Sequence, residues 1–250
     1  MKRTFEILIC VAFLVACTSS AKSVAQQRPA YATVIIAQTG AAAAETSANK
    51  VLDASNVVVW LTPLDKAEAN RSRQRSLEHS PQLVQRHKTF EPHILIVPVG
   101  TTVEFPNKDP FFHNIFSLYD GKRFDLGLYE AGTTRSVLFG RSGVSFLFCN
   151  IHAEMSAVVV AVDTPYFGLS DKLGNVIIPN TPDGRYQMNV WYERSLPQSL
   201  KELTRAVTIS DSTRHLGLIR FLENPNFSPA HKNKYGLEYV PPPNSDYDRP

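Results

Sequence analysis

The chain has 250 residues, of which 43% are hydrophobic and 20% charged, with a net charge of +3 at pH 7. The length accommodates one large or two small folded domains, and the composition is that of a soluble globular protein, not of a disordered or fibrous chain. The positive charge is slight and no basic, aromatic surface motif accompanies it, so nucleic-acid binding is not indicated.

The first 25 residues have the pattern of an export signal. Two basic residues precede an apolar run at residues 7–16, which is too short to span a membrane, where roughly 20 residues are needed. Two processing sites compete. Residues 14–17 (LVAC) are similar to a bacterial lipobox, which would make Cys17 a lipidated N-terminus, whereas residues 23–25 (SVA) suit ordinary signal cleavage. Either site predicts a location on the periplasmic or extracellular side of a bacterial membrane, with a lipid anchor in the first case.

Residues 31–86 are expected to form N-terminal strands and a charged loop. Residues 32–38 (ATVIIAQ) predict a strand, and residues 56–61 (NVVVWL), which are short and β-branched, predict a buried strand. Residues 31–61 are expected to supply edge strands to one of the two sandwiches. Residues 62–86 are charged and lack strand periodicity, so the sequence predicts a long surface loop or a short exposed helix.

Residues 87–164 differ from the preceding segment and consist of short apolar runs separated by turns that contain Gly, Pro, Asn and Asp. This spacing is typical of a β-sandwich or barrel and not of alternating strands and helices. The predicted strands are at residues 93–100, 101–107, 135–139, 144–149 and 156–163.

Residues 165–225 continue the alternation of strands and turns and predict a second, smaller β-sandwich. About five strands in so short a segment are near the lower limit for an independent core, so this unit is expected to pack against the first. Residues 226–250 contain a run of three prolines and few apolar residues, which predicts a disordered or surface-hugging tail.

The three cysteines are unevenly distributed. Cys10 and Cys17 belong to the targeting segment, so the mature chain keeps Cys149 alone. In an oxidising compartment an unpaired thiol is a reactive liability unless something occupies it. A buried thiol that packs as a small hydrophobic group is the alternative.

The neighbours of Cys149 favour a metal ligand. Cys149, His152 and Met155 have the spacing C-x2-H-x2-M and lie between two predicted strands, where a loop can bring the three side chains together. His113, in a turn-rich connection after another strand, is the best candidate for a fourth ligand. Two imidazoles, one thiolate and a weak axial thioether are the ligands of a blue, or type 1, copper site.

Other metal and catalytic sites fit the residues less well. Structural zinc sites do not ordinarily use methionine. A binuclear copper centre needs a second cysteine in the loop, and multicopper oxidases need His-x-His pairs, which the seven histidines do not form. A Cys149–His152 protease dyad is the remaining alternative, but no helix-borne nucleophile is indicated and Met155 has no role in it. His79, His87, His215 and His231 stand in polar contexts and are expected to be solvated.

Two segments together resemble the cupredoxin family of plastocyanin and amicyanin type. They are VPVGTTVEFPNKDPFFHNIFS and FLFCNIHAEM, within residues 89–163. The resemblance implies that His113, Cys149, His152 and Met155 bind one copper ion. It also implies that Asn114 ties the two ligand loops together and forms a hydrogen bond near the sulfur. Ile151 departs from the family, whose members often have proline at that position.

The whole chain is similar to exported proteins described as methylamine-utilisation-like. In these a cupredoxin precedes a domain of the carboxypeptidase-regulatory, or transthyretin-like, type, and the segment GNVIIPNTPDGRY at residues 174–186 carries that second resemblance. The implied fold is all-β, a Greek-key sandwich over residues 87–164 followed by a small transthyretin-like sandwich over 165–225.

The expected function is one-electron transfer between redox protein partners, with no substrate bond broken by this chain. The alternative is a copper-handling or non-redox binding module on the same scaffold. Phe111 and Phe112 beside His113, and Ile151 and Ala153 beside His152, are expected to form an apolar rim where a redox partner docks.

Overall fold

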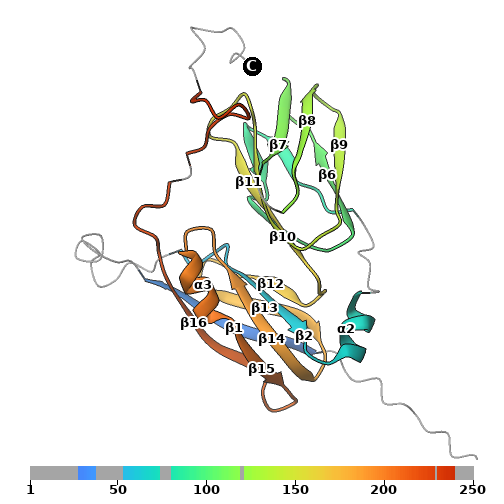
Figure 1. Cartoon of the computed structure of the whole chain (residues 1–250), viewed down its shortest axis with the longest axis vertical. Helices are drawn as coiled ribbons and strands as arrows, with labels where there is room; N and C mark the ends of the chain where they lie inside the picture. The colour runs from blue at the N-terminus through green and yellow to red at the C-terminus, as the bar shows by residue number, and fades with distance from the viewer. Residues whose placement is uncertain (1–27, 38–52, 74–79, 119–120, 229, 240–250) are drawn as a thin grey trace, which may run out of the picture.

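The chain is almost entirely β in the parts that the structure describes. In this computed structural model (Figure 1) the described parts are residues 28–37, 53–73, 80–118, 121–228 and 230–239. Two short helices, α2 (Lys66–Arg73) and α3 (Pro197–Leu203), interrupt the strands, and neither has the length and hydrophobicity that a bilayer crossing requires. The predicted all-β fold class is confirmed. The expected export signal with Cys17 lies outside the described residues.

The first sandwich contains a five-stranded sheet whose neighbours are far apart in the sequence. Strands β5 and β11 run parallel, whereas β10 pairs antiparallel with both β11 and β7. The sheet order is β5 (Ile94–Pro98), β11 (Ser156–Val162), β10 (Gly143–Phe148), β7 (His113–Ser117) and β8 (Phe124–Tyr129).

A second layer faces this sheet across a hydrophobic core. It contains the antiparallel pairs β6 (Thr101–Pro106) with β9 (Thr134–Phe139), and β3 (Val84–Arg86) with β4 (Thr89–Glu91). Inward-facing residues of both layers, among them Phe105 of β6, belong to one buried cluster. The core of this sandwich therefore fills the space beneath the residues that were predicted to bind metal.

The prediction that His113 lies in a turn-rich connection was wrong, because His113 is the first residue of strand β7. All five residues of this strand are buried, and β7 lies between β10 and β8. A strand buried on both faces lacks the alternation of apolar and polar residues on which strand prediction depends. Strand β8 also escaped prediction, since Gly127 interrupts it with a φ of +66°.

The second sandwich combines strands that precede the first sandwich in the sequence with strands that follow it. Its core joins residues from two sheets. One sheet has the order β13 (Asn175–Thr181), β1 (Arg28–Ala37), β16 (His215–Leu222), and the other β12 (Phe167–Leu169), β2 (Val58–Pro63), β14 (Gly184–Trp191), β15 (Arg205–Ile209). Strands β1 and β2 were expected at sheet edges, but each lies between two partners. The likeness of this unit to transthyretin-like domains stays a prediction.

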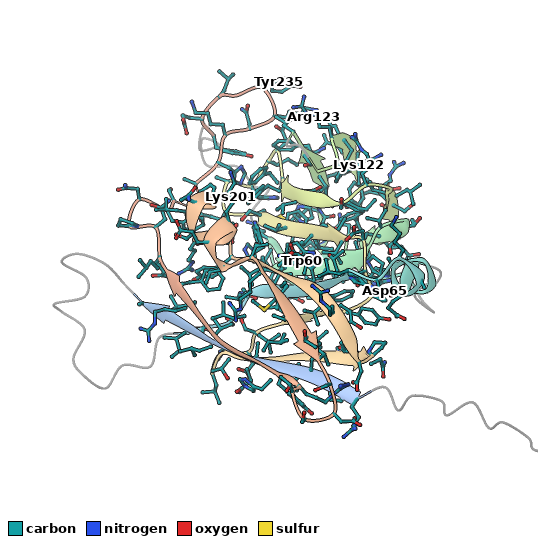
Figure 2. The ribbon with its side chains drawn as sticks, turned by 60° about the horizontal axis from the view of Figure 1, so that its bottom comes forward. Trp60, Asp65, Lys122, Arg123, Lys201 and Tyr235 are labelled. Atoms are coloured by element: carbon teal, nitrogen blue, oxygen red, sulfur yellow. The ribbon has the colours of Figure 1, made fainter. Side chains whose placement is uncertain are left out.

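Strand β11 lies between two hydrophobic cores. Val159 points into the core of the first sandwich, whereas Val158 and Val160 pack with Trp191 of the second. Figure 2 shows Trp60, which joins the same cluster, where the two sandwiches meet. Because side chains alternate along a strand, this one element packs against both units. The second sandwich therefore packs against the first, as the sequence predicted.

Candidate metal centre

Three side chains that were predicted as metal ligands converge on one point in the first sandwich. The donor atoms of His113, Cys149 and His152 all lie within 4.8 Å of one another. The Sγ of Cys149 is 3.8 Å from Nδ1 of His113 and 3.5 Å from Nδ1 of His152. His113 and Cys149 are completely buried, and His152 is half-buried. Both imidazoles therefore present the same ring nitrogen to the sulfur.

The folding of the loop between β10 and β11 explains this convergence. Cys149 follows the last residue of β10, and Met155 precedes the first residue of β11. The backbone N–H of Cys149 donates to the carbonyl of Met155 at 3.0 Å, and the N–H of Met155 donates to that of His152 at 3.2 Å. These bonds continue the β10–β11 pairing into the loop and turn His152 back towards the cysteine.

Met155 is fully buried in the same apolar cluster as Cys149. It therefore packs in the apolar core that also contains Cys149. Its role as a weak axial ligand stays a prediction.

His113 is fixed by a carboxylate that the sequence analysis did not assign. Its Nε2 donates to Oδ2 of Asp109 at 2.7 Å, which leaves Nδ1 as the acceptor that faces Cys149. Asp109 is itself held by the backbone N–H groups of His87 and Lys88, at 2.6 and 3.0 Å. Such carboxylate–histidine pairs orient metal ligands and fix their tautomer. The position of Asp109 four residues before His113 was the feature of the sequence from which this pair could have been predicted.

The protonation of the imidazole and the thiol follows from burial. Burial lowers the pKa of His113 and outweighs the opposite effect of Asp109, so the ring is neutral near pH 7. Burial also raises the pKa of Cys149, although backbone N–H groups of Asn114, Ile151 and His152 point at the sulfur and counteract this rise. The thiol is thus protonated until a cation binds, and three donors are already aimed at the thiolate that a cation would create.

Asn114 occupies a different place from the one that the resemblance implied. Its backbone N–H is directed at the sulfur of Cys149, but its side-chain Nδ2 donates to Oδ1 of Asp125 at 2.7 Å. The connection between the two ligand segments therefore runs through the main chain of Asn114. Its amide secures β7 to the neighbouring strand β8.

Aromatic and aliphatic side chains surround the more exposed histidine. The ring of Phe111 is 5.1 Å from that of His113 and 5.7 Å from that of His152, centre to centre. Phe112 and Ile151 are 43% and 41% exposed. Phe112, which precedes His113, and Ile151, which precedes His152, are thus both at the surface. The docking rim around His152 stays a prediction.

The donor set and its spacing fit a single soft metal ion. With metal–sulfur and metal–nitrogen bonds of about 2.3 and 2.0 Å at trigonal angles, sulfur and nitrogen lie about 3.7 Å apart. The observed separations of 3.8 and 3.5 Å are close to this value. One cysteine sulfur and two imidazole nitrogens are ligand types that suit copper in both of its common oxidation states.

Comparisons with known proteins give partial structural likenesses. No family model and no curated protein matches the sequence. Among solved structures, a purple cupredoxin from Nitrosopumilus maritimus is 26% identical, over 33% of this chain and 99% of its own, with a TM-score of 0.31. A copper-containing nitrite reductase from Thermus scotoductus SA-01 is 26% identical over 40% of this chain and 27% of its own, with a TM-score of 0.33. A reduced amicyanin variant is 20% identical over 36% and 90%, with a TM-score of 0.32.

Proposed function

We propose that this protein carries single electrons by means of one type 1 copper ion bound by His113, Cys149, His152 and Met155. The observation that carries the proposal is the convergence of one thiol and two imidazole Nδ1 atoms at 3.5 and 3.8 Å in a buried site. His113 and Cys149 are 36 residues apart in the sequence, so their convergence depends on the fold and not on local spacing.

The side chains have distinct roles in this function. When bound, copper supplies a one-electron couple. Cys149 would hold the ion as a strongly coupled thiolate, together with the Nδ1 atoms of His113 and His152. Met155 would be a weak thioether ligand that adjusts the reduction potential. The Nε2–H of His113 donates to Asp109, which keeps the Nδ1 atom aimed at the site.

The rigidity of the site supports electron transfer over copper storage. His113 begins strand β7 and Cys149 directly follows strand β10, and main-chain hydrogen bonds close the loop from Cys149 to Met155. A fixed ligand set that suits both oxidation states reorganises little when one electron is gained or lost. A copper carrier needs ligands that open, whereas Cys149 and His113 are completely buried.

The expected partner is a redox protein that docks on the apolar rim at Phe112 and Ile151. We infer that electrons reach the site through the ring of His152, which is half-buried. We further propose that the protein is exported, that a lipidated Cys17 holds it at the membrane surface, and that it breaks no substrate bond itself.

Copper reconstitution of the metal-free protein tests this function. An intense visible thiolate-to-copper band is expected on addition of Cu(II), and Cys149→Ala should abolish it. His215→Gln is the matched control, because His215 lies on β16 in the second sandwich. Phe112→Ser should keep the band and slow electron exchange with a partner. A colourless complex that releases Cu(I) quickly to a chelator would instead establish copper handling.

A further inference from the structure

The chain beyond strand β16 returns from the second sandwich to the metal site. Strand β16 ends at Leu222, and the following residues run along the first sandwich (Figure 1). Their contacts are specific. Lys234 and Tyr239 form hydrogen bonds to the loop that contains Cys149. We refer to residues 223–228 and 230–239 as the C-terminal segment.

Tyr239 reaches the metal-binding cysteine itself. Its hydroxyl donates to the carbonyl oxygen of Cys149 at 2.5 Å, and the tyrosine is half-buried. The carbonyl of Cys149 and its sulfur belong to the same residue, so the hydroxyl restrains the backbone from which the thiol projects. The sulfur receives N–H groups on its other side from Asn114, Ile151 and His152.

Lys234 links the two segments that supply ligands. Its backbone N–H donates to Oδ1 of Asn150, the residue after Cys149, at 3.0 Å. Its Nζ contacts Oδ2 of Asp125 at 2.7 Å, and Oδ1 of the same carboxylate accepts from Asn114, the residue after His113. One lysine thus connects the cysteine loop to strand β7.

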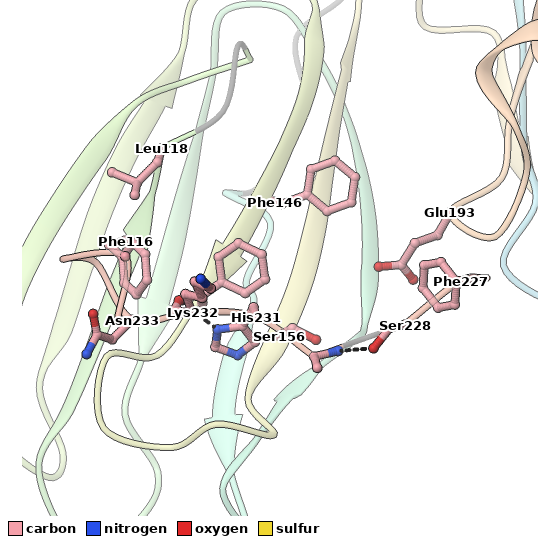
Figure 3. Close-up of a pocket in the computed structure, with 13 residues that line it drawn as sticks. Phe116, Leu118, Phe146, Ser156, Glu193, Phe227, Ser228, His231, Lys232 and Asn233 are labelled. Atoms are coloured by element: carbon pink, nitrogen blue, oxygen red, sulfur yellow. Dashed lines mark hydrogen bonds between the residues drawn. The ribbon is translucent and has the colours of Figure 1, made fainter. Parts of the chain in front are cut away.

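Ring packing holds the same segment against the sheet. The ring of His231 is 4.2 Å from that of Phe148 and 5.3 Å from that of Tyr239. Phe116, Phe146, Phe227 and His231 all line a cavity of about 420 Å³, and Figure 3 shows Phe227 next to Glu193. The expectation that His231 is solvated was wrong, because it packs on the residue that precedes Cys149.

From these contacts we propose that the C-terminal segment is part of the metal centre, and that Tyr239 and Lys234 are its positioning residues. They hold the loop at Cys149 against β7 before metal binds. The proposal deepens the proposed function and rests on it for every effect measured with copper. The effect of Tyr239 and Lys234 on the loop of the metal-free protein does not depend on which metal the site binds.

The metal-free protein gives the first test. Cys149 is fully buried, so a thiol reagent such as iodoacetamide reacts only when the loop opens, and the rate reports that opening. Tyr239→Phe removes one hydrogen bond and is expected to raise the rate about fivefold. Lys234→Ala removes a partly exposed ion pair and is expected to raise it about twofold.

Two control variants match these changes. Tyr31→Phe removes the same atom from a 40% exposed ring on β1 in the second sandwich, and Lys232→Ala removes the same charge from a pair with the exposed Glu238 in the C-terminal segment. Both are expected to react like the native protein. Equal rates in all four variants and the native chain would overturn the proposal. Lys234→Ala keeps the test valid if Tyr239→Phe folds poorly, because its side chain is peripheral to the core.

The copper-loaded protein gives the second test. Tyr239→Phe should shift the charge-transfer band and lower the reduction potential, because the hydroxyl stabilises the more electron-rich state of the Cys149 ligand. Tyr31→Phe should leave both unchanged. An unaltered band and potential, with unaltered alkylation, would refute the role of Tyr239. If the native protein forms no visible band but Tyr239→Phe accelerates alkylation, the electron-transfer function fails and the positioning role stands.

Discussion

Asp109 decides which nitrogen of His113 is available to a metal. A free imidazole exchanges its proton between two nitrogens, and either tautomer is open to it. Here the carboxylate accepts from Nε2, and two backbone N–H groups hold that carboxylate in turn. Burial works to raise the pKa of Asp109, but the hydrogen bonds from Lys88, His113 and His87 together lower it, so the group is ionised near pH 7.

We expect Asp109→Asn to weaken copper binding about 10- to 100-fold, the usual loss when a partner of a metal-bound histidine is removed. The amide has nearly the same size but no charge, so it does not enforce the Nε2–H tautomer of His113. Competition with a chromophoric Cu(I) chelator measures the affinity. Asp171→Asn, an exposed aspartate in the second sandwich, should leave it unchanged. Equal affinities in the two variants would contradict the tautomer argument.

Local spacing and long-range contacts differ in how well the sequence predicts them. Cys149, His152 and Met155 lie within one short loop, so their convergence follows from the strands on either side. The roles of Tyr239 and Lys234 depend on where the chain runs after it leaves another sheet, which no local pattern encodes. The side chain of Asn114 donates a hydrogen bond to Asp125 on the neighbouring strand β8, and this long-range partner could not be predicted from the sequence around Asn114.

Among the elements, turns were predicted more reliably than strand partners. One turn of the alternation expected over residues 165–225 lies at residues 172–174, and the structure shows why it needs glycine. Gly174 has a φ of +82°, and a Cβ there would lie 2.1 Å from the carbonyl oxygen of Val34 on β1. That strand donates its Val34 N–H to the carbonyl of Gly174 at 2.7 Å. The turn therefore binds β1 into the sheet through close backbone contact.

Replacing Gly174 with alanine should destabilise the protein by about 1–3 kcal/mol or more, because positive φ and the clash with Val34 both oppose a side chain. Urea denaturation measures the loss. The control is Gly140→Ala, where the Cβ would meet nothing within 4 Å. That variant should unfold within about 0.5 kcal/mol of the native protein. A similar loss at both positions would show that the Gly174 contact is unimportant.

Strand β7 and helix α3 show the limit of element prediction. The sequence HNIFS at residues 113–117 has no alternation, because the sheet buries one face and the C-terminal segment approaches the other at Phe116. Helix α3 begins at Pro197, which suits the first turn of a helix, but it has no fully buried residue and so gave no apolar stripe to detect.

At the scale of the whole molecule, the second sandwich supports the sheet that carries the metal ligands. Val158 and Val160 of β11 pack with Trp191. Val162 at the end of β11 and Ile94 of the neighbouring strand β5 belong to the same cluster. The C-terminal segment adds a second connection at the opposite end of the sheet. Both ends of the ligand-bearing strand β10 are therefore restrained by the rest of the chain.

A histidine–carboxylate pair crosses between the two sandwiches. His93, next to β5, contacts Oε2 of Glu193 with its Nε2 at 2.7 Å, and its Nδ1 lies 3.2 Å from the carbonyl of Ser156. The hydrogen bond to Glu193 raises the pKa of His93 and outweighs burial, which lowers it. The charged imidazolium is thus favoured in the folded protein.

This pair makes the contact between the sandwiches depend on pH. Because the folded pKa of His93 is raised, its contribution to stability is complete below the unfolded value of about 6.5 and is lost as the pH rises through the folded pKa. Glu193→Gln should therefore lower the melting temperature most at about pH 5.5–6, which is below the unfolded pKa of His93. The difference from the native protein should shrink towards about pH 9. Glu130→Gln, an exposed carboxylate on a turn, should show no such trend. A Glu193→Gln deficit that stays constant across this range would mean that His93 carries no charge in the native pair.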